Sequence, residues 1–141
     1  MIRVVVDTSV LIRYLIKPST AIRELIEDHW LDGDIQLVTA PSLIDELRNV
    51  LQRDYIKALI RPEEGQAPLE AIYRKADILP QLGEVPSFTR DPKDDEFIAY
   101  ALAGNAEYFV SVDNDLLVLR ALQDLRVMTP YDFANRSEGQ A

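Results

Sequence analysis

Short runs of β-branched and apolar residues, separated by helical segments, constrain the fold of this chain most strongly. The first run covers residues 2–6, similar runs cover residues 35–39 and 108–112, and Val127 with Met128 indicates a short last strand. Near-continuous apolar runs of this length are typical of strands that are buried on both faces of a parallel sheet. Strands that alternate with helices predict an α/β fold with helices on both faces of the sheet. Helical periodicity fits residues 9–16, 20–31, 42–52, 54–61, 68–79, 93–103 and 115–122.

The length of the chain is that of one domain. It has 141 residues, of which 48% are hydrophobic, enough for one buried core. We find no internal repeat, low-complexity segment or linker, and we predict a domain over residues 1–134 followed by a polar tail over residues 135–141. Residues 62–70 contain two prolines and a glycine, which indicates a loop inside the domain.

The composition excludes several kinds of site. The chain has no cysteine, so disulfides and thiolate metal sites are excluded, and its one histidine, His29, lies in a polar helical stretch that favours the surface. There is no run of about 18 apolar residues and no secretory signal pattern, so we expect a cytoplasmic protein without a membrane partner. Acid–base or metal chemistry is therefore left to carboxylates.

Two aspartates directly follow predicted strands. Asp7 follows the first strand and Asp113 follows the strand at residues 108–112. Because parallel strands end at one edge of a sheet, both side chains should emerge there, where α/β sheets bind ligands. Each residue alone is equally well explained as a helix cap or a turn residue.

Glu46 lies in the helix that follows the second strand. Ser42 and Asp45 predict a capping box at the start of that helix. Glu46 borders the apolar stripe of the helix while Asp45 points nearly the opposite way, so Glu46 is placed to face the sheet edge. A glutamate whose stem lies along the core and whose head reaches water has the same pattern.

The densest charge cluster covers residues 90–96. Asp91 followed by Pro92 predicts a helix that is capped by the aspartate and begins at the proline. Asp94 and Asp95 then both point toward the apolar face of the helix or its border, and periodicity does not choose between them. Acids in a first helical turn are also stabilised by the helix dipole alone.

Taken together, the acids predict a cation site. Carboxylates packed at one edge repel one another unless a cation neutralises them, and oxygen-only ligands suit Mg²⁺ or Mn²⁺. The net charge of −9 is unusual for a nucleic-acid binder. Two bound divalent ions would bring four positive charges to the place that a phosphate must approach.

Four motifs in order resemble those of the PIN domain family, and most closely its VapC-like branch of toxins from toxin–antitoxin systems. The motifs lie at residues 4–11, 42–47, 90–99 and 110–117, and the resemblance covers residues 2–134. It implies a three-layer α/β/α sandwich with a five-stranded parallel sheet. It also implies Mg²⁺- or Mn²⁺-dependent cleavage of single-stranded RNA.

The same resemblance implies which residues carry the chemistry. The acidic quartet of the family, as catalytic and metal-binding residues, falls on Asp7, Glu46, Asp95 and Asp113. Asp95 is chosen over Asp94 because Ile98 and Ala99 follow it at the spacing of the family motif. The resemblance makes Asp94 a supporting acid and Asp115 an accessory one. The small hydroxyl after the first acid matches Thr8 or Ser9, and Ser111 stands where many relatives have threonine.

The expected function is therefore an endoribonuclease that uses metal-activated water. Arg48, Arg90 and Lys93 are candidates to contact RNA phosphates. The resemblance further implies the toxin role, a homodimer and a small antitoxin that blocks the site, for which an Arg or Lys of the antitoxin would supply the cation.

Three alternatives have different sequence requirements. A receiver-like phospho-acceptor domain needs an acid pair at the first strand end and a late lysine, but residues 106–131 contain no lysine. A haloacid-dehalogenase-like phosphatase needs a second acid two residues after Asp7, where the chain has Ser9. A PIN domain that acts as an interaction module without turnover is disfavoured by the intact quartet.

Overall fold

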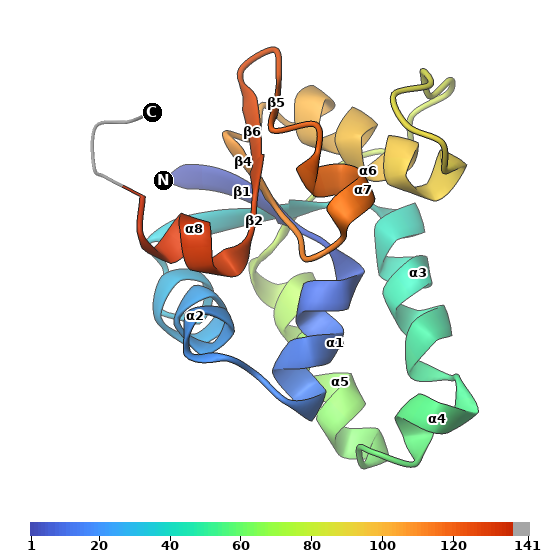
Figure 1. Cartoon of the computed structure of the whole chain (residues 1–141). Helices are drawn as coiled ribbons and strands as arrows, with labels where there is room; N and C mark the ends of the chain where they lie inside the picture. The colour runs from blue at the N-terminus through green and yellow to red at the C-terminus, as the bar shows by residue number, and fades with distance from the viewer. Residues whose placement is uncertain (137–141) are drawn as a thin grey trace.

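The computed structural model describes residues 1–136 and is built around a six-stranded sheet with the order β3-β2-β1-β4-β6-β5 (Figure 1). The strands are β1 (Ile2–Val6), β2 (Ile35–Thr39), β3 (Asp77–Ile78), β4 (Tyr108–Val110), β5 (Ala121–Leu122) and β6 (Leu125–Met128). The helices are α1 (Thr8–Ile16), α2 (Thr20–Arg23), η1 (Glu24–Leu31, a π-helix), α3 (Pro41–Leu51), α4 (Asp54–Lys57), α5 (Pro62–Lys75), α6 (Pro92–Ala103), α7 (Asn114–Leu117) and α8 (Pro130–Ala134).

The expected five-stranded, all-parallel sheet is wrong in one respect, because the sheet is mixed and has six strands. Strands β3, β2, β1, β4 and β6 are parallel, whereas β5 pairs antiparallel with β6. Only Gln123 and Asp124 separate β5 from β6, and a connection that short permits only an antiparallel hairpin. Strands of two residues, such as β3 and β5, leave no hydrophobic period in a sequence.

Helices cover both faces of the sheet, as the sequence predicts. Alternate residues of β1 point to opposite sides: Val4 and Val6 belong to one apolar cluster and Val5 to the other. Helices α1, α2, α5 and α8 with η1 pack against the first face, and α6 and α7 pack against the second (Figure 1). This alternation places the carboxyl ends of β1 and β4 between the two helical layers.

Among the local predictions that are wrong, two concern helices α5 and α3. Residues 62–70 belong to helix α5, which continues through Pro68. An internal proline costs a helix about 3 kcal/mol, and the burial of Leu69 and Ile72 on the same helix offsets that cost. The predicted capping box of Ser42 and Asp45 does not form, because α3 begins one residue earlier, at Pro41.

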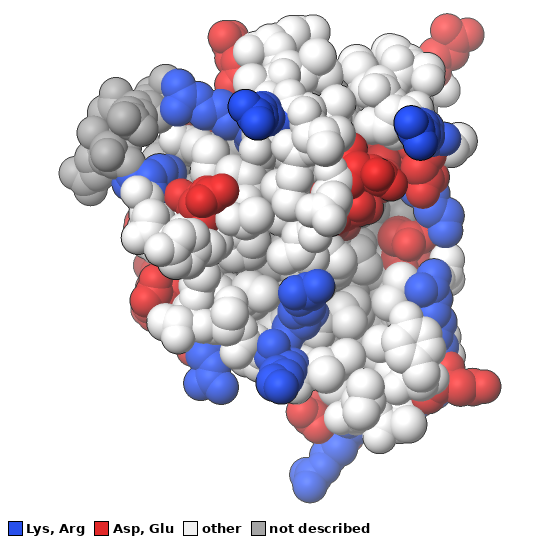
Figure 2. Space-filling view, viewed as in Figure 1, with Lys and Arg blue, Asp and Glu red and all other residues white. Residues whose placement is uncertain are grey.

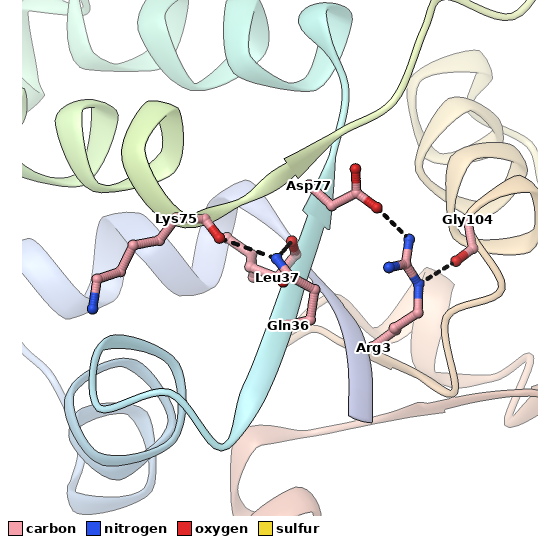
Figure 3. A network of polar contacts seen from close by, with 6 residues as sticks. All are labelled: Arg3, Gln36, Leu37, Lys75, Asp77 and Gly104. Carbon is pink, nitrogen blue, oxygen red and sulfur yellow. Dashed lines mark hydrogen bonds and ion pairs between the residues drawn. The ribbon is translucent and has the colours of Figure 1, made fainter. Parts of the chain in front are cut away.

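A polar network joins β1 to β3 and to the end of α6 (Figure 3). The Arg3 guanidinium contacts the Asp77 carboxylate at 2.6 Å, and Arg3 Nε donates to the carbonyl of Gly104 at 2.7 Å. A Cβ on Gly104 would lie 2.7 Å from a methyl carbon of Val38. The close approach of α6 to the sheet therefore requires glycine at this position.

The structure describes only the first two residues of the predicted C-terminal tail, Asn135 and Arg136. Of the predicted tail, residues 137–141 lie outside the described residues. Within residues 1–136, the model contains no helix with the length and apolar character needed to cross a membrane.

Candidate active site

Acidic side chains from four separate elements line a cleft of about 450 Å³ at the carboxyl edge of the sheet. Asp7 directly follows β1, Asp113 lies three residues beyond β4, Glu46 comes from α3, and Asp94 comes from the first turn of α6. Figure 2 shows carboxylates gathered in a hollow of the surface, with basic side chains around it. Three of the four predicted site residues therefore line one cleft.

Asp7 is buried and is held by two hydroxyl groups. Ser111 Oγ donates to Asp7 Oδ2 at 2.7 Å, and Ser9 Oγ donates to the same oxygen at 3.0 Å. Burial raises the pKa of Asp7 more than these hydrogen bonds lower it, and the charge of Asp113 raises it further. Burial and the neighbouring Asp113 thus disfavour the charged form of Asp7.

Asp94 has the most strongly shifted pKa among the acids of the cleft. Burial, followed by the charges of Asp113, Asp91, Asp7 and Asp115, raises the pKa of Asp94 to about 6. A carboxylate that neighbouring carboxylates destabilise in this way gains from any cation that enters.

Asp95, the fourth predicted residue, does not line this cleft. Its Oδ1 accepts hydrogen bonds from the backbone N–H groups of Phe88 and Thr89, at 2.8 and 2.7 Å, and from the Thr89 hydroxyl at 3.0 Å. Burial raises the pKa of Asp95, but these donors outweigh it, and the pKa is lowered. The geometry gives Asp95 the task of fixing the loop before α6, and it places Asp94 among the acids of the cleft.

Basic groups line the same cleft. Lys93 Nζ lies 3.7 Å from Glu46 Oε2, and Arg13 and Arg53 are further lining residues. Arg53 Nη1 donates to the hydroxyl of Tyr55, which also lines the cleft, at 3.5 Å. These side chains bring positive charge to the lining of an otherwise acidic cleft.

The other residues singled out in the sequence lie around or away from the cleft. Asp115 is exposed on α7, and its backbone N–H donates to Asp113 Oδ1 at 3.0 Å. Arg48 lies on another side of α3, and Arg90 is exposed outside the cleft lining. His29 pairs with Asp34 at 2.8 Å.

The donor set can be tested against a divalent metal ion. Among residues 1–136, no three Asp, Glu or His side chains lie close enough together to form a preassembled metal site. The chemistry of the donors nevertheless fits Mg²⁺ or Mn²⁺, because the side chains of the cleft that can bind a metal ion offer oxygen atoms, most of them from carboxylates, and two of these acids have raised pKa values. Asp7, Asp94 and Asp113 are the residues that would hold such an ion.

Comparison with known proteins decides the family. The model of the PIN domain family matches residues 3–115, more than half of the chain. The chain belongs to the PIN domain family. PIN domains are usually nucleases, and they generally use divalent metal ions.

One solved structure to which the chain is similar is the PIN domain of human SMG5. The two chains are 16% identical, the alignment covers 93% of this chain and 95% of the other, and the TM-score is 0.49. No curated protein matches the chain at a significant level.

Sequence reasoning missed Arg13, Arg53 and Tyr55 as cleft residues and gave Asp94 only a supporting place. The signal for Asp94 was present, because helical periodicity points both Asp94 and Asp95 toward the core face. The backbone N–H groups that occupy Asp95 belong to residues 88 and 89, in a loop whose conformation no local pattern predicts. Arg53 had no such signal, because it lies beyond the end of α3 with extended backbone, and no helical stripe links it to Glu46.

Proposed function

We propose that this PIN domain is an endoribonuclease that cleaves single-stranded RNA with Mg²⁺ or Mn²⁺. The observation that carries the proposal is the cleft in which Asp7, Asp94 and Asp113 repel one another and basic side chains stand close by. Such a cleft is stabilised by a cation, and with a cation bound it can accept a phosphodiester.

The carboxylates of the cleft would have two roles, metal binding and orientation of the attacking water. Asp7, Asp94 and Asp113 would hold the ion, and Glu46 would either hold it or orient the attacking water by accepting a proton from it. When bound, the ion supplies an activated water and offsets the charge that develops on the phosphate. Ser9 and Ser111 donate to one oxygen of Asp7, which orients that carboxylate.

The basic residues at the cleft would position the RNA. Arg13 and Arg53 can donate hydrogen bonds to phosphate oxygens. Lys93 is 67% exposed and lies near Glu46, so it can turn from that carboxylate to a phosphate. With its phosphates held in this way, the backbone of an RNA strand would lie against the acidic side chains of the cleft.

Incubation of the purified protein with a mixture of single-stranded RNAs tests the proposal. Cleavage should stop in excess EDTA and return when Mn²⁺ or Mg²⁺ is added. Asp94→Asn should remain inactive after the metal is restored, while Asp28→Asn, an exposed change outside the cleft, should cut like the parent. Cleavage that continues undiminished in chelator would refute metal dependence.

A binding module without turnover is the second candidate function. It is favoured by the spacing of the carboxylates, which are not gathered into a metal site within the part of the chain that the structure describes. RNA binding without cleavage at any metal concentration would select it over the nuclease.

The role of toxin in a toxin–antitoxin pair, the homodimer and the antitoxin belong to the same proposal. An antitoxin that blocks the cleft would most simply place an Arg or Lys against Asp7 and Asp94. Light scattering that shows only monomer at tens of micromolar would defeat the dimer. A complex with inhibitor that leaves the acids open would defeat the blocking model.

A further inference from the structure

A second hollow, of about 460 Å³, lies between α3, α4 and α5. We call it the α3–α5 groove, and its basic lining residues are Arg48, Lys57 and Arg61. Glu70 is the one acidic residue among the residues that line it. A groove with three positive charges and one negative charge, in a chain with a net charge of −9, favours an anionic ligand.

Helix α3 separates this groove from the acidic cleft. Glu46 and Val50 are separated by the helical spacing of four residues on α3 and line the cleft, as does Arg53, which lies just beyond the end of that helix. Arg48, Leu51 and Gln52 lie on other sides of the same helical turns and line the groove. The two hollows are thus neighbours, separated by the width of one helix, about 10 Å.

Tyr73 supplies an aromatic surface in the groove. It is 56% exposed, and its hydroxyl accepts a hydrogen bond from Arg48 Nη2 at 2.9 Å. Arg48 is itself held by Asp45 at 3.1 Å, so the hydroxyl of Tyr73 is bound by a guanidinium that is paired in turn. Leu51 and Leu69 line the groove nearby. An exposed ring beside apolar side chains and cations is suited to stack a nucleobase whose phosphate meets the cations.

We propose that the α3–α5 groove binds nucleotides of the same single-stranded RNA on one side of the scissile bond. The inference rests on the proposed function, because that function is what places a single strand of RNA in the acidic cleft. Arg53 lies between α3 and α4 and Tyr55 lies in the first turn of α4, where an RNA strand passing from one hollow to the other would cross. An acidic protein segment would also satisfy the charges, but it would make less use of the Tyr73 ring. RNA uses the charges, the ring and the continuity with the cleft together.

The test measures RNA binding in the full chain carrying Asp94→Asn, so that RNA stays intact while Mg²⁺ is present. The probes are labelled RNAs of about four nucleotides, which occupy one hollow, and of about twelve, which reach both. The double variant Lys57→Gln with Arg61→Gln should weaken binding of the long RNA by about tenfold and leave the short RNA unchanged. In a plot of the logarithm of the binding constant against the logarithm of the salt concentration, the slope should become less steep by about 0.7 for each lost phosphate contact.

Matched variants separate the groove from net charge. Arg23→Gln with Arg74→Gln removes the same charge from exposed helix positions outside the groove and should leave the long RNA bound as in the parent. Tyr73→Ala should weaken the long RNA by about fivefold or more, because stacking is lost, while Tyr73→Phe should retain most of the affinity. Equal losses in the two double variants would overturn the inference, as would equal losses for the two RNAs.

Three other outcomes are decisive. If a polyglutamate peptide displaces the long RNA at lower concentration than unlabelled RNA does, the groove is a site for an acidic protein and the inference fails. If the parent chain cuts RNA but the groove variants bind as it does, the inference fails and the nuclease stands. If the parent never cuts RNA and the groove variants still lose binding, the nuclease fails and the RNA groove stands.

Discussion

The hydroxyl of Ser111 donates to Asp7 Oδ2 at 2.7 Å and at the same time accepts the backbone N–H of Asp113 at 3.0 Å. Ser111 is fully buried beyond the end of β4, and it connects the acid that follows β1 to the acid that follows β4. The Asp7 carboxylate and the backbone of Asp113 are therefore held relative to one another by a side chain that does not itself line the cleft.

Ser111→Ala should weaken metal-dependent cleavage by about 10–100-fold, the usual cost of losing a hydrogen bond that orients a metal ligand. Without this donor the pKa of Asp7 should rise further, so the apparent affinity for Mn²⁺ should fall more than the rate at saturating Mn²⁺. Titration of activity with Mn²⁺ measures both. Ser42→Ala is the control, because the buried Ser42 Oγ has no partner. An equal loss in both variants would contradict the role of Ser111.

Asp94→Asn should impair catalysis, whereas Asp95→Ala should impair the stability of the fold. Asp94→Asn should abolish cleavage and leave the metal-free Tm equal or higher, because it removes one charge from a repelling cluster. Asp95→Ala should lower the Tm, because the N–H groups of Phe88 and Thr89 lose their acceptor. Thermal melts paired with RNA cleavage measure this. An inactive Asp95→Ala of unchanged Tm would return Asp95 to the catalytic set.

The metal-free protein should lose stability as pH rises from about 4 to about 6. The folded pKa of Asp94, about 6, exceeds its ordinary value of 3.8, so the folded state binds this proton more tightly than the unfolded state. Ionisation of Asp94 in this window should cost about 1 kcal/mol, after allowance for solvent screening of a partly exposed group. The Tm should therefore fall by about 2–4 °C.

Melts at pH 4 and pH 7 test this pH dependence. Asp94→Asn, or excess Mg²⁺ in the parent, should reduce the fall, whereas Asp28→Asn should keep it. An unchanged slope in Asp94→Asn would show that other groups cause the effect.

Gly104→Ala should destabilise the fold by about 1–3 kcal/mol, the range for overpacking a core. The added Cβ would lie 2.7 Å from Val38 and 2.9 Å from Leu79, both on side-chain carbons. Gly83→Ala is the matched control, because nothing lies within 4 Å of its Cβ position. Urea unfolding of both variants measures the difference, and equal midpoints would contradict the close approach of α6.

The sequence by itself determined the elements that leave a long hydrophobic period. Residues 2–6 and 35–39 form strands with the predicted bounds, and Asp91 caps α6 with Pro92 at its first position. Strand 2–6 also fixed where Asp7 emerges, because a residue that follows a strand lies at its carboxyl edge. These features depend on local periodicity and local hydrogen bonds, which a sequence carries.

Only the tertiary structure decided the remaining features, because they depend on residues far apart in the chain. Helix α5 runs through Pro68 because packing of its buried face offsets the proline, and β3 exists because two residues pair with Val38 and Thr39. The choice between Asp94 and Asp95 followed from the loop at residues 88 and 89, whose N–H groups take one carboxylate away from the cleft. Helical phase alone gave the two aspartates equal standing, and a contact outside the helix separated them.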